Sequence, residues 1–239
     1  STLREAALPY PIVVKPDVGE RGTKVEKVTN AAELAAQMRA IGGPFIVQEF
    51  VREPVEFGIL YSRLPGETRG RVTSITRKGF LTVTGDGRST IEDLMQQSTR
   101  ARFQLDTMRQ RLGAGMNEVL PSGETRLLEP IGNHCRGTMF IDDNHLISEE
   151  LNAVFDRIAA PIDGFHFGRF DLKVRSVEDL LAGRTIRILE LNGASSEPGH
   201  IYDPRHSLRE AYRDLARHWA ILAEICIRQK ARGVHPVPF

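Results

Sequence analysis

A carboxylate inside an apolar strand is the feature that most restricts how this chain can fold. The segment TIRILELNGASSEPGHIYDP, residues 185–204, begins with the isoleucine and leucine side chains that are typical of a buried strand. Glu190 interrupts it, and Asn192 and a run of small polar residues follow. An ionised carboxylate in an apolar strand is costly unless a cation meets it. The segment therefore raises the expectation of a cation beside Glu190.

The order of patterns along the chain predicts an α+β fold with antiparallel sheets, because hairpins outnumber strand–helix–strand alternations. Residues 12–28 are typical of a strand, a glycine loop and a second strand, and Asn30 with Glu33 resembles a capping box that starts a helix ended by Gly42. The further expected elements are strands at 44–51 and 55–64, a hairpin over 71–87, a long helix from a Ser89–Glu92 cap to about Leu112, strands around a polar loop at 125–142, a helix at 148–162 and strands at 167–174 and 185–192.

A last helix follows a Ser207–Glu210 capping box. Its apolar side chains recur at helical spacing and form one stripe. The stripe consists of Leu208, Tyr212, Leu215, Trp219, Leu222 and Ile225.

Charge and hydropathy exclude several classes of protein. The formal net charge of +1 predicts no strong field toward nucleic acid or a membrane surface. No apolar run approaches the roughly 20 residues of a membrane span, and no basic-then-apolar leader begins the chain. We therefore expect a cytoplasmic protein in which Cys135 and Cys226 are reduced, small buried residues.

Two neighbouring strands near the C-terminus carry the side chains best suited to a metal ion. In GRFDLKV, residues 168–174, Asp171 shares one face with Arg169 and Lys173, while in the next strand Glu190 and Asn192 share a face with Ile186 and Ile188. Paired as a hairpin, the strands would bring two carboxylates and an amide oxygen together, which suits Mg²⁺. The alternative is a solvated polar face of an antiparallel sheet, and spacing alone leaves both open.

Other polar motifs are ambiguous when taken singly. KPDVGERGTKV places Lys15 and two glycines where backbone N–H groups can approach an anion, although a hairpin turn with an exposed lysine fits equally well. GDGRS at residues 85–89 lacks a Gly-Lys-Ser/Thr ending and indicates a turn before a helix. Glu49 and Glu56 would be functional only if both lined one cleft.

The order of these motifs is more specific than any one of them. Strand-Lys-Pro with a glycine loop, then an apolar-Glu-Phe-Val run, Glu-Phe, Arg-x-Asp and Glu-x-Asn resembles the ATP-grasp superfamily over residues 12–204. The chain is most similar to the carboxylate–amine ligases: D-alanine–D-alanine ligase, glutathione synthetase and the ATP-grasp part of cyanophycin synthetase. The resemblance implies two α+β lobes with antiparallel sheets clamping the nucleotide. We expect residues 1–62 to form the lobe with the glycine-rich loop and adenine hinge, and residues 63–239 the lobe with the metal and phosphate site and the substrate loop.

The resemblance also implies roles for single residues. Lys15 matches the lysine on the α- and β-phosphates, Glu56 the carboxylate on the ribose, and Arg169 the arginine that steadies the transferred phosphoryl group. The implied nucleotide-binding residues are Lys15, Gly19, Glu20, Arg21, Gly22, Gln48, Glu49, Phe50, Val51, Glu56 and Asn133. The implied catalytic residues are Arg169, Lys15 and Arg136, and the implied metal ligands are Asp171, Glu190 and Asn192. Arg77 and Lys78 are weaker candidates for the γ-phosphate.

The function implied is that of an ATP-dependent carboxylate–amine ligase. A small-molecule carboxylate would become an acyl phosphate, and an amine would displace phosphate to give an amide or peptide-like bond. ATP and two Mg²⁺ ions are the implied cofactors, with Mn²⁺ as a substitute. Two alternatives stay open: an ATP-grasp kinase that stops at the phosphorylated product, and a non-catalytic ATP-binding module of a larger assembly.

Two departures from the family pattern affect the substrates. The domain that usually precedes the grasp lobes is absent from this sequence, so we expect a preceding domain, a partner or a homo-oligomer to complete the acceptor pocket. The loop GASSEPGHIYDP is longer than in D-alanine–D-alanine ligase. Its side chains, Ser195, Ser196, His200, Tyr202 and Arg205, either read a different substrate or serve ordinary turn chemistry.

Overall fold

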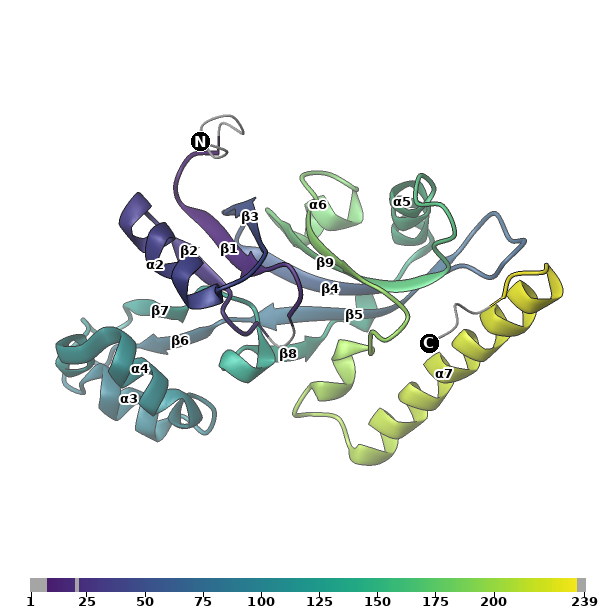
Figure 1. The fold of residues 1–239 in the computed structure, drawn as a ribbon. Helices are drawn as coiled ribbons and strands as arrows, with labels where there is room; N and C mark the ends of the chain where they lie inside the picture. The colour runs from purple at the N-terminus through teal and green to yellow at the C-terminus, as the bar shows by residue number, and fades with distance from the viewer. Residues whose placement is uncertain (1–7, 20–21, 236–239) are drawn as a thin grey trace. The chain divides into compact units, whose positions relative to one another are not determined.

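The computed structural model describes residues 8–19 and 22–235 (Figure 1). Helices accompany sheets whose strands pair antiparallel, as β1 does with β2 and β4 with β9, so the predicted α+β class is confirmed. The chain divides into two compact units, each made of two segments. Unit 1 comprises Ser1–Val51 and Gly79–Met139, and unit 2 comprises Arg52–Lys78 and Phe140–Phe239.

Unit 1 contains a three-stranded sheet in the order β2-β1-β3 and a two-stranded sheet of β6 and β7. Ile12, Val14 and Val28 form a small core in the first sheet, and Met95 and Met108 belong to a second core beside the other. The elements are β1 (Ile12–Pro16), β2 (Glu26–Val28), α2 (Ala31–Ile41), β3 (Phe45–Glu49), β6 (Leu81–Thr84), α3 (Ile91–Gln97), α4 (Leu105–Leu112) and β7 (Thr125–Glu129), with 3-10 turns at Ala101–Gln104, Gly113–Asn117 and His134–Arg136.

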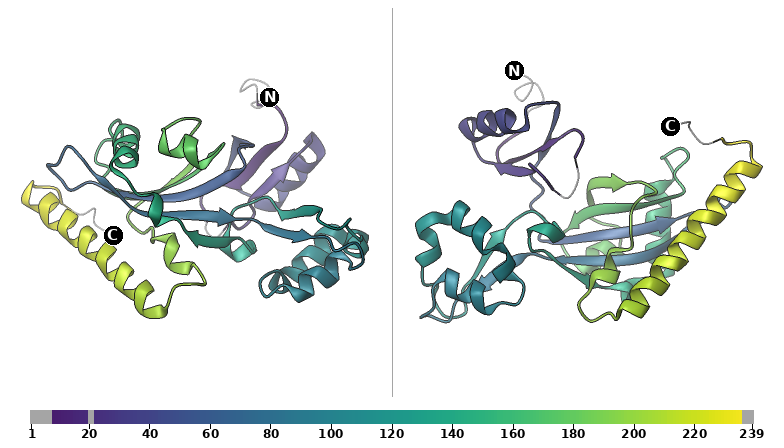
Figure 2. Two further views of the ribbon diagram at one scale, coloured as in Figure 1. Left: turned by 180° about the vertical axis from the view of Figure 1, so that it is seen from behind. Right: turned by 60° about the horizontal axis from the view of Figure 1, so that its bottom comes forward.

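Unit 2 is built on a five-stranded sheet in the order β10-β9-β4-β5-β8. Its elements are β4 (Val55–Ser62), β5 (Arg71–Gly79), β8 (Met139–Asp142), α5 (Glu149–Ala159), β9 (Phe167–Val174), α6 (Val177–Leu181), β10 (Arg187–Asn192) and α7 (Leu208–Ala231), with 3-10 turns at Asn144–Leu146 and Gly199–Tyr202. Figures 1 and 2 show α5 and α6 on one face of this sheet and α7 on the other.

The alternation of β4 divides its side chains between these two faces. Phe57, Ile59 and Tyr61 are fully buried in the main core, together with Phe155 of α5 and Leu180 of α6. Full burial of such side chains contributes about 1.5–3 kcal/mol each, so this face holds the helices in place. The opposite face carries Leu60, which packs with Phe167 and with Ile225 of α7.

Two of the predicted helix caps are confirmed and one is wrong. Asn30 caps α2, which ends at Gly42 with φ 70°, and Ser207 with Glu210 forms the capping box of α7. The Ser89–Glu92 cap is wrong by one residue, because Thr90 and Asp93 form the box while the Ser89 hydroxyl donates to Asp86. The expected long helix is also wrong, since α3 and α4 are separated by a 3-10 turn.

The segment at residues 71–87 is not a hairpin. β5 joins the five-stranded sheet of unit 2, whereas β6 pairs with β7 in unit 1. A single residue, Phe80, connects the two strands, and a two-residue turn is the shortest common hairpin connection. β5 instead forms an antiparallel hairpin with β4, and residues 63–70 connect the two strands.

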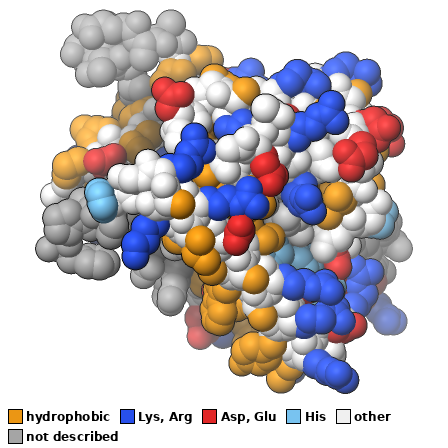
Figure 3. All heavy atoms as spheres, turned by 90° about the vertical axis from the view of Figure 1, so that its right-hand side faces the viewer, with side chains coloured by type: hydrophobic (Ala, Val, Ile, Leu, Met, Phe, Trp, Pro, Cys, Tyr) orange, Lys and Arg blue, Asp and Glu red, His pale blue; other side chains and the backbone are white. Residues whose placement is uncertain are grey.

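The apolar stripe of α7 is not its buried face. Leu208, Tyr212 and Trp219 are 78%, 72% and 63% exposed, whereas Ile225 is buried. Figure 3 views the side of the molecule where α7 ends and shows hydrophobic side chains beside Lys and Arg. The prediction of buried cysteines is likewise wrong, because Cys135 and Cys226 are both exposed and free.

The two units differ from the contiguous lobes expected from the sequence. β4 and β5 lie on either side of the expected 62/63 boundary, yet they are neighbouring strands of one sheet. The assignment of functional lobes to residues 1–62 and 63–239 stays a prediction. In the part of the chain that is described, no helix has the length and apolar character needed to cross a membrane.

Candidate functional site

The strand register of unit 2 places a set of polar side chains on one face of its sheet. Asp171 lies opposite Gly58 of β4 on one side and Glu190 of β10 on the other, and Arg169 lies opposite Asn192. Directly opposed residues of antiparallel strands project to the same face. The face therefore carries the three predicted metal ligands together with Arg169.

A bulge in β10 determines the direction of Glu190. The register shifts between Ile188, which is opposite Leu172, and Glu190, which is opposite Asp171. A bulge adds one residue to the strand, here Leu189, so Ile188 and Glu190 lie opposite adjacent residues of β9 and project to opposite faces. The expectation that Ile188 and Glu190 share a face is therefore wrong. The expectation that this segment is a buried strand is also wrong, since β10 is an edge strand in which Ile188 is 43% exposed. Glu190 is exposed and forms no hydrogen bond or salt bridge with the described residues, so it carries no burial cost.

A buried group of charges occupies the centre of this face. Lys78 Nζ donates to Glu56 at 2.8 Å and to Asp171 at 3.3 Å, and Arg169 Nε donates to Asp171 at 2.7 Å. Lys173 Nζ lies 3.9 Å from the Glu56 carboxylate. Glu56 and Asp171 are 4% and 8% exposed, so their charges depend on these cations rather than on water.

The pKa values in the group shift as paired charges require. Burial alone would raise the pKa of Asp171, but Lys78 and Arg169 outweigh it and hold the pKa below its usual value. Burial alone would lower the pKa of Lys78, but Asp171 and Glu56 outweigh it and raise the pKa. Asp171 and Lys78 are therefore both ionised at neutral pH.

The pairing of Asp171 with Lys78 and Arg169 should make the free energy of unfolding depend on pH in the acid range. Because the folded pKa of Asp171 is lowered, its contribution is present above the unfolded pKa of about 3.9 and is lost as pH falls through the folded value. We expect the difference in unfolding free energy between the wild type and Asp171→Asn to be constant at pH 5–7 and to shrink below about pH 4. Urea titrations across this range measure it, and a difference that stays the same down to the lowest pH at which the chain folds would contradict the assignment.

Two glycines leave room for these side chains. A Cβ on Gly58 would lie 3.2 Å from Arg169 Cδ and 3.3 Å from Asp171 Oδ1. A Cβ on Gly168 would lie 2.5 Å from the backbone oxygen of Asn192, which is too close for any real contact. A larger residue at position 168 would therefore push β10 away from β9.

We expect Gly168→Ala to destabilise unit 2 by about 1–3 kcal/mol through this overpacking. Gly193→Ala, one residue beyond β10, is the matched control, because no atom lies within 4 Å of its added Cβ. Thermal unfolding of both variants measures the effect. Equal melting temperatures would show that β10 is not held against Gly168.

The donor set on this face fits a hard cation. Asp171, Glu190 and Asn192 offer oxygen ligands of the kind that Mg²⁺ prefers. Asn192 Nδ2 is a buried N–H donor without a hydrogen-bond partner among the described residues, so it is placed to donate to an anion such as a phosphate oxygen, whereas the amide oxygen would be the metal ligand. Within residues 8–19 and 22–235 there is no group of three or more His, Cys, Asp or Glu that could hold a metal by itself. A cation here would depend on the Asn192 amide or on a bound anion as well.

Lys78 has a more central position than the sequence analysis predicted. It lies at the centre of the charged group, whereas Arg77 turns away and donates to Asp143 at 2.7 Å. Strand alternation contained the signal, because Thr76 opposes Gly58 and Lys78 follows two residues later on the same face.

The predicted site residues of unit 1 form a separate set. Lys15 lies in β1 opposite Ile46, and the space beside Gly22 is filled by Asn133, whose Nδ2 would lie 3.0 Å from an added Cβ. The loop around Asn133 thus contacts the end of the glycine-rich loop. Glu20 and Arg21 lie outside the described residues.

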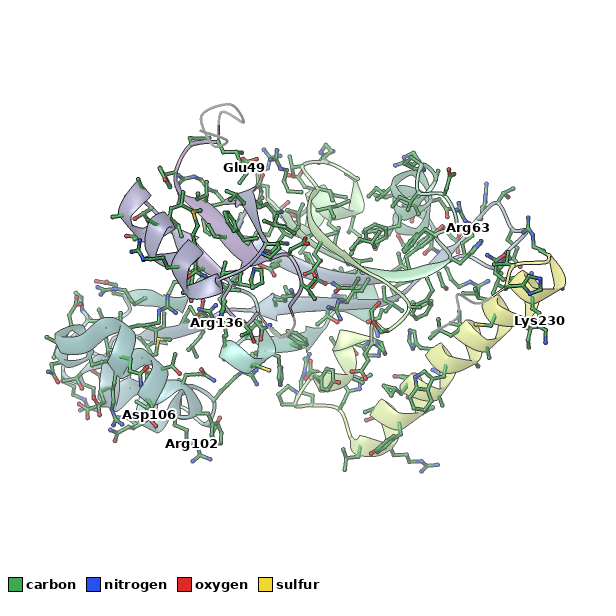
Figure 4. All side chains as sticks on the ribbon, viewed as in Figure 1. Glu49, Arg63, Arg102, Asp106, Arg136 and Lys230 are labelled. Atoms are coloured by element: carbon green, nitrogen blue, oxygen red, sulfur yellow. The ribbon has the colours of Figure 1, made fainter. Side chains whose placement is uncertain are left out.

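Arg136, labelled in Figure 4, holds the glycine-rich loop rather than standing free. It donates to the Val25 carbonyl at 2.6 Å and pairs with Glu26 and with the buried Glu129. In the predicted hinge Gln48, Glu49, Phe50 and Val51, the Phe50 ring lies 4.4 Å below the Lys27 ammonium group. The catalytic and adenine-binding roles of these residues stay predictions.

No family model and no curated protein matches the chain. Among solved structures, the chain is similar to a bifunctional glutathione synthetase from Pasteurella multocida, with 14% identity, a TM-score of 0.45 and coverage of 92% of this chain and 32% of that one. It is also similar to D-alanine–D-alanine ligase from Bacillus anthracis complexed with ATP, with 13% identity, a TM-score of 0.48 and coverage of 97% and 59%.

A D-Ala:D-Ser ligase, VanG from Enterococcus faecalis, matches with 16% identity, a TM-score of 0.42 and coverage of 91% and 52%. The chain thus spans less than two thirds of the length of each of these proteins. At this distance the likenesses assign no substrate or residue role, which must come from this chain's own residues.

Proposed function

We propose that this chain is an ATP-dependent ligase that activates a carboxylate as an acyl phosphate and joins it to an amine. One observation carries the proposal: the sheet of unit 2 gathers Lys78, Arg169, Asp171 and Glu190 on a single face. Two cations beside two carboxylates, with an unpartnered amide at Asn192, suit a metal-bound polyphosphate.

Each side chain has a definite task in this proposal. Asp171, Glu190 and Asn192 would hold magnesium, which neutralises phosphate charge when bound. Arg169 and Lys78 would bind oxygens of the transferred phosphoryl group, exchanging part of their contact with Asp171 for the phosphate. Glu56 anchors Lys78 within the charged group. The nucleotide contacts proposed for unit 1, led by Lys15, rest on the sequence motifs.

The reaction needs positioning more than covalent help. A carboxylate oxygen attacks the γ-phosphorus of ATP, the bond to the bridging oxygen breaks, and ADP leaves. The neutral amine nitrogen then attacks the acyl carbon, phosphate departs with the electron pair of the C–O bond, and the nitrogen releases a proton to water to leave the amide. No nucleophilic side chain is required, and none lies in the charged group.

An isotope experiment tests the proposal directly. The chain is incubated with ATP, magnesium and a pool of amino acids carrying ¹⁸O in their carboxyl groups, and the released phosphate is analysed by mass spectrometry. We expect one ¹⁸O atom in the phosphate, because the acyl C–O bond breaks. A stable phosphorylated product without free phosphate would indicate a kinase instead. Binding of ATP without turnover of any pool would indicate a non-catalytic module.

A further inference from the structure

The loop after β10 presents one exposed carboxylate from a fixed backbone. Glu197 is exposed, whereas the next three residues, Pro198, Gly199 and His200, are buried. His200 is held at both ring nitrogens, by Ser74 Oγ at 2.7 Å and by Asp214 at 3.3 Å. Ser196 Oγ donates to the Asn192 carbonyl at 3.0 Å on the other side. Glu197 is therefore not a loosely attached surface residue.

The surroundings of Glu197 connect it to the charged group. Arg169, which donates to Asp171 through Nε, donates through Nη1 to the backbone carbonyl of Glu197 at 3.4 Å. The Tyr202 hydroxyl donates to the Glu197 carboxylate. The Tyr202 ring packs edge-on against Phe140, with the ring centroids 6.3 Å apart, and this contact restricts the position of Tyr202.

Charge defines what this carboxylate can bind. Burial, and then the Glu197 carboxylate, raise the pKa of Tyr202 to about 12, so Tyr202 is a neutral donor at neutral pH. With the described residues, the Glu197 carboxylate forms no salt bridge to a lysine or arginine, although it contributes to the raised pKa of Arg169. A phosphate or carboxylate at this position would be repelled, whereas a cation would complete the pair.

We propose that Glu197 binds the ammonium group of the amine substrate, so that the acceptor is recognised as a primary ammonium cation, which releases one proton to water before its nitrogen attacks the acyl carbon. Tyr202 is a positioning residue, because its hydroxyl orients the carboxylate. In this proposal Arg169 lies between the phosphate site beside Asp171 and the ammonium site at Glu197. The inference rests on the proposed function, since only a reaction with an amine acceptor uses this group.

Amines of different charge separate this role from a structural one. Hydroxylamine is mostly neutral at neutral pH and traps acyl phosphates as hydroxamates, whereas ethylamine and amino acids carry an ammonium group. The full chain is incubated with ATP, magnesium and pooled amino acids as carboxylates, with hydroxylamine or with ethylamine as acceptor. Hydroxamates are measured by iron(III) absorbance and amides by mass spectrometry, for the wild type, Glu197→Gln and Tyr202→Phe. Glu149→Gln is the matched control, because Glu149 is exposed on α5 in the same unit.

We expect Glu197→Gln to lower kcat/KM for ammonium acceptors by roughly 10- to 100-fold, which is the range of one lost charged hydrogen bond, with hydroxamate formation unchanged. Tyr202→Phe should shift the same ratio by a smaller factor, and Glu149→Gln should leave it unchanged. The inference would be overturned if Glu197→Gln lowered kcat/KM equally for both acceptors or for neither. It would also be overturned if the wild type formed hydroxamates but no amides from ammonium acceptors. In each case carboxylate activation would still stand. A wild type that forms neither hydroxamate nor amide would remove the proposed function and the inference together.

Discussion

Replacing Lys78 by methionine should lower the free energy of unfolding more than any other single substitution in the charged group of the unit 2 sheet. The ammonium group is bonded to Glu56 at 2.8 Å and Asp171 at 3.3 Å, and its side chain is only 8% exposed. Lys78→Met keeps the length of the side chain but leaves two buried carboxylates short of a cation. Removing one partner of a buried pair costs roughly 3–5 kcal/mol. In a chain of this length that lowers the melting temperature by roughly 6–20 °C.

The same chemical change on α7 supplies the control. Lys230, labelled in Figure 4, is exposed in the last turn, so Lys230→Met should change the unfolding free energy by less than about 1 kcal/mol. Calorimetric melting of both variants gives the comparison. A Lys78→Met protein as stable as the wild type would mean that water, rather than Lys78, compensates Glu56 and Asp171.

The sequence predicted the composition of the candidate site better than its geometry. Alternation along β9 placed Asp171 and Arg169 on one face correctly, because period-two patterning follows from strand geometry alone. The bulge at Leu189 was not predictable, since no glycine or other turn residue marks it in the strand. Lys78 was underrated because its partners come from β4 and β9, which are adjacent to β5 or one strand further away but distant in sequence.

Local competition explains the misplaced helix start. Ser89 and Glu92 have the spacing of a capping box, but Asp86 accepts from the Ser89 backbone N–H at 2.7 Å and from its hydroxyl. Ser89 is therefore held in the turn by Asp86 and does not cap the helix, and Thr90 caps α3 instead. Propensity identifies candidate caps, whereas the preceding turn selects among them.

The position of α7 shows a limit of periodicity. The stripe through Tyr212 and Trp219 has helical spacing, yet the buried side of the helix includes His218, which bonds to the Asp214 carbonyl at 2.7 Å. Burial lowers the pKa of His218, consistent with a neutral ring in this position. A polar residue with satisfied hydrogen bonds can face the sheet while apolar residues face water, and hydropathy does not distinguish the two.

Glu190→Gln should weaken magnesium-dependent nucleotide binding strongly, with little change in stability. The Glu190 side chain is exposed and forms no hydrogen bond or salt bridge with the described residues, although it contributes to the raised pKa of Arg169, so the substitution should change the stability little. It removes one of the two carboxylates that oppose each other across β9 and β10. Loss of a metal-binding carboxylate should weaken magnesium-dependent binding at least about tenfold. Asp171→Asn would lose the same ligand chemistry but also disturb the buried pairs, so Glu190 gives the cleaner comparison.

Calorimetric titration of ADP and of a non-hydrolysable ATP analogue, with and without Mg²⁺, tests the central claim most directly. The wild type should bind both nucleotides more tightly with Mg²⁺, and Glu190→Gln should lose that increment while melting at the wild-type temperature. Binding that is indifferent to Mg²⁺ in the wild type, or unchanged in Glu190→Gln, would contradict a metal–nucleotide site on this face of the sheet.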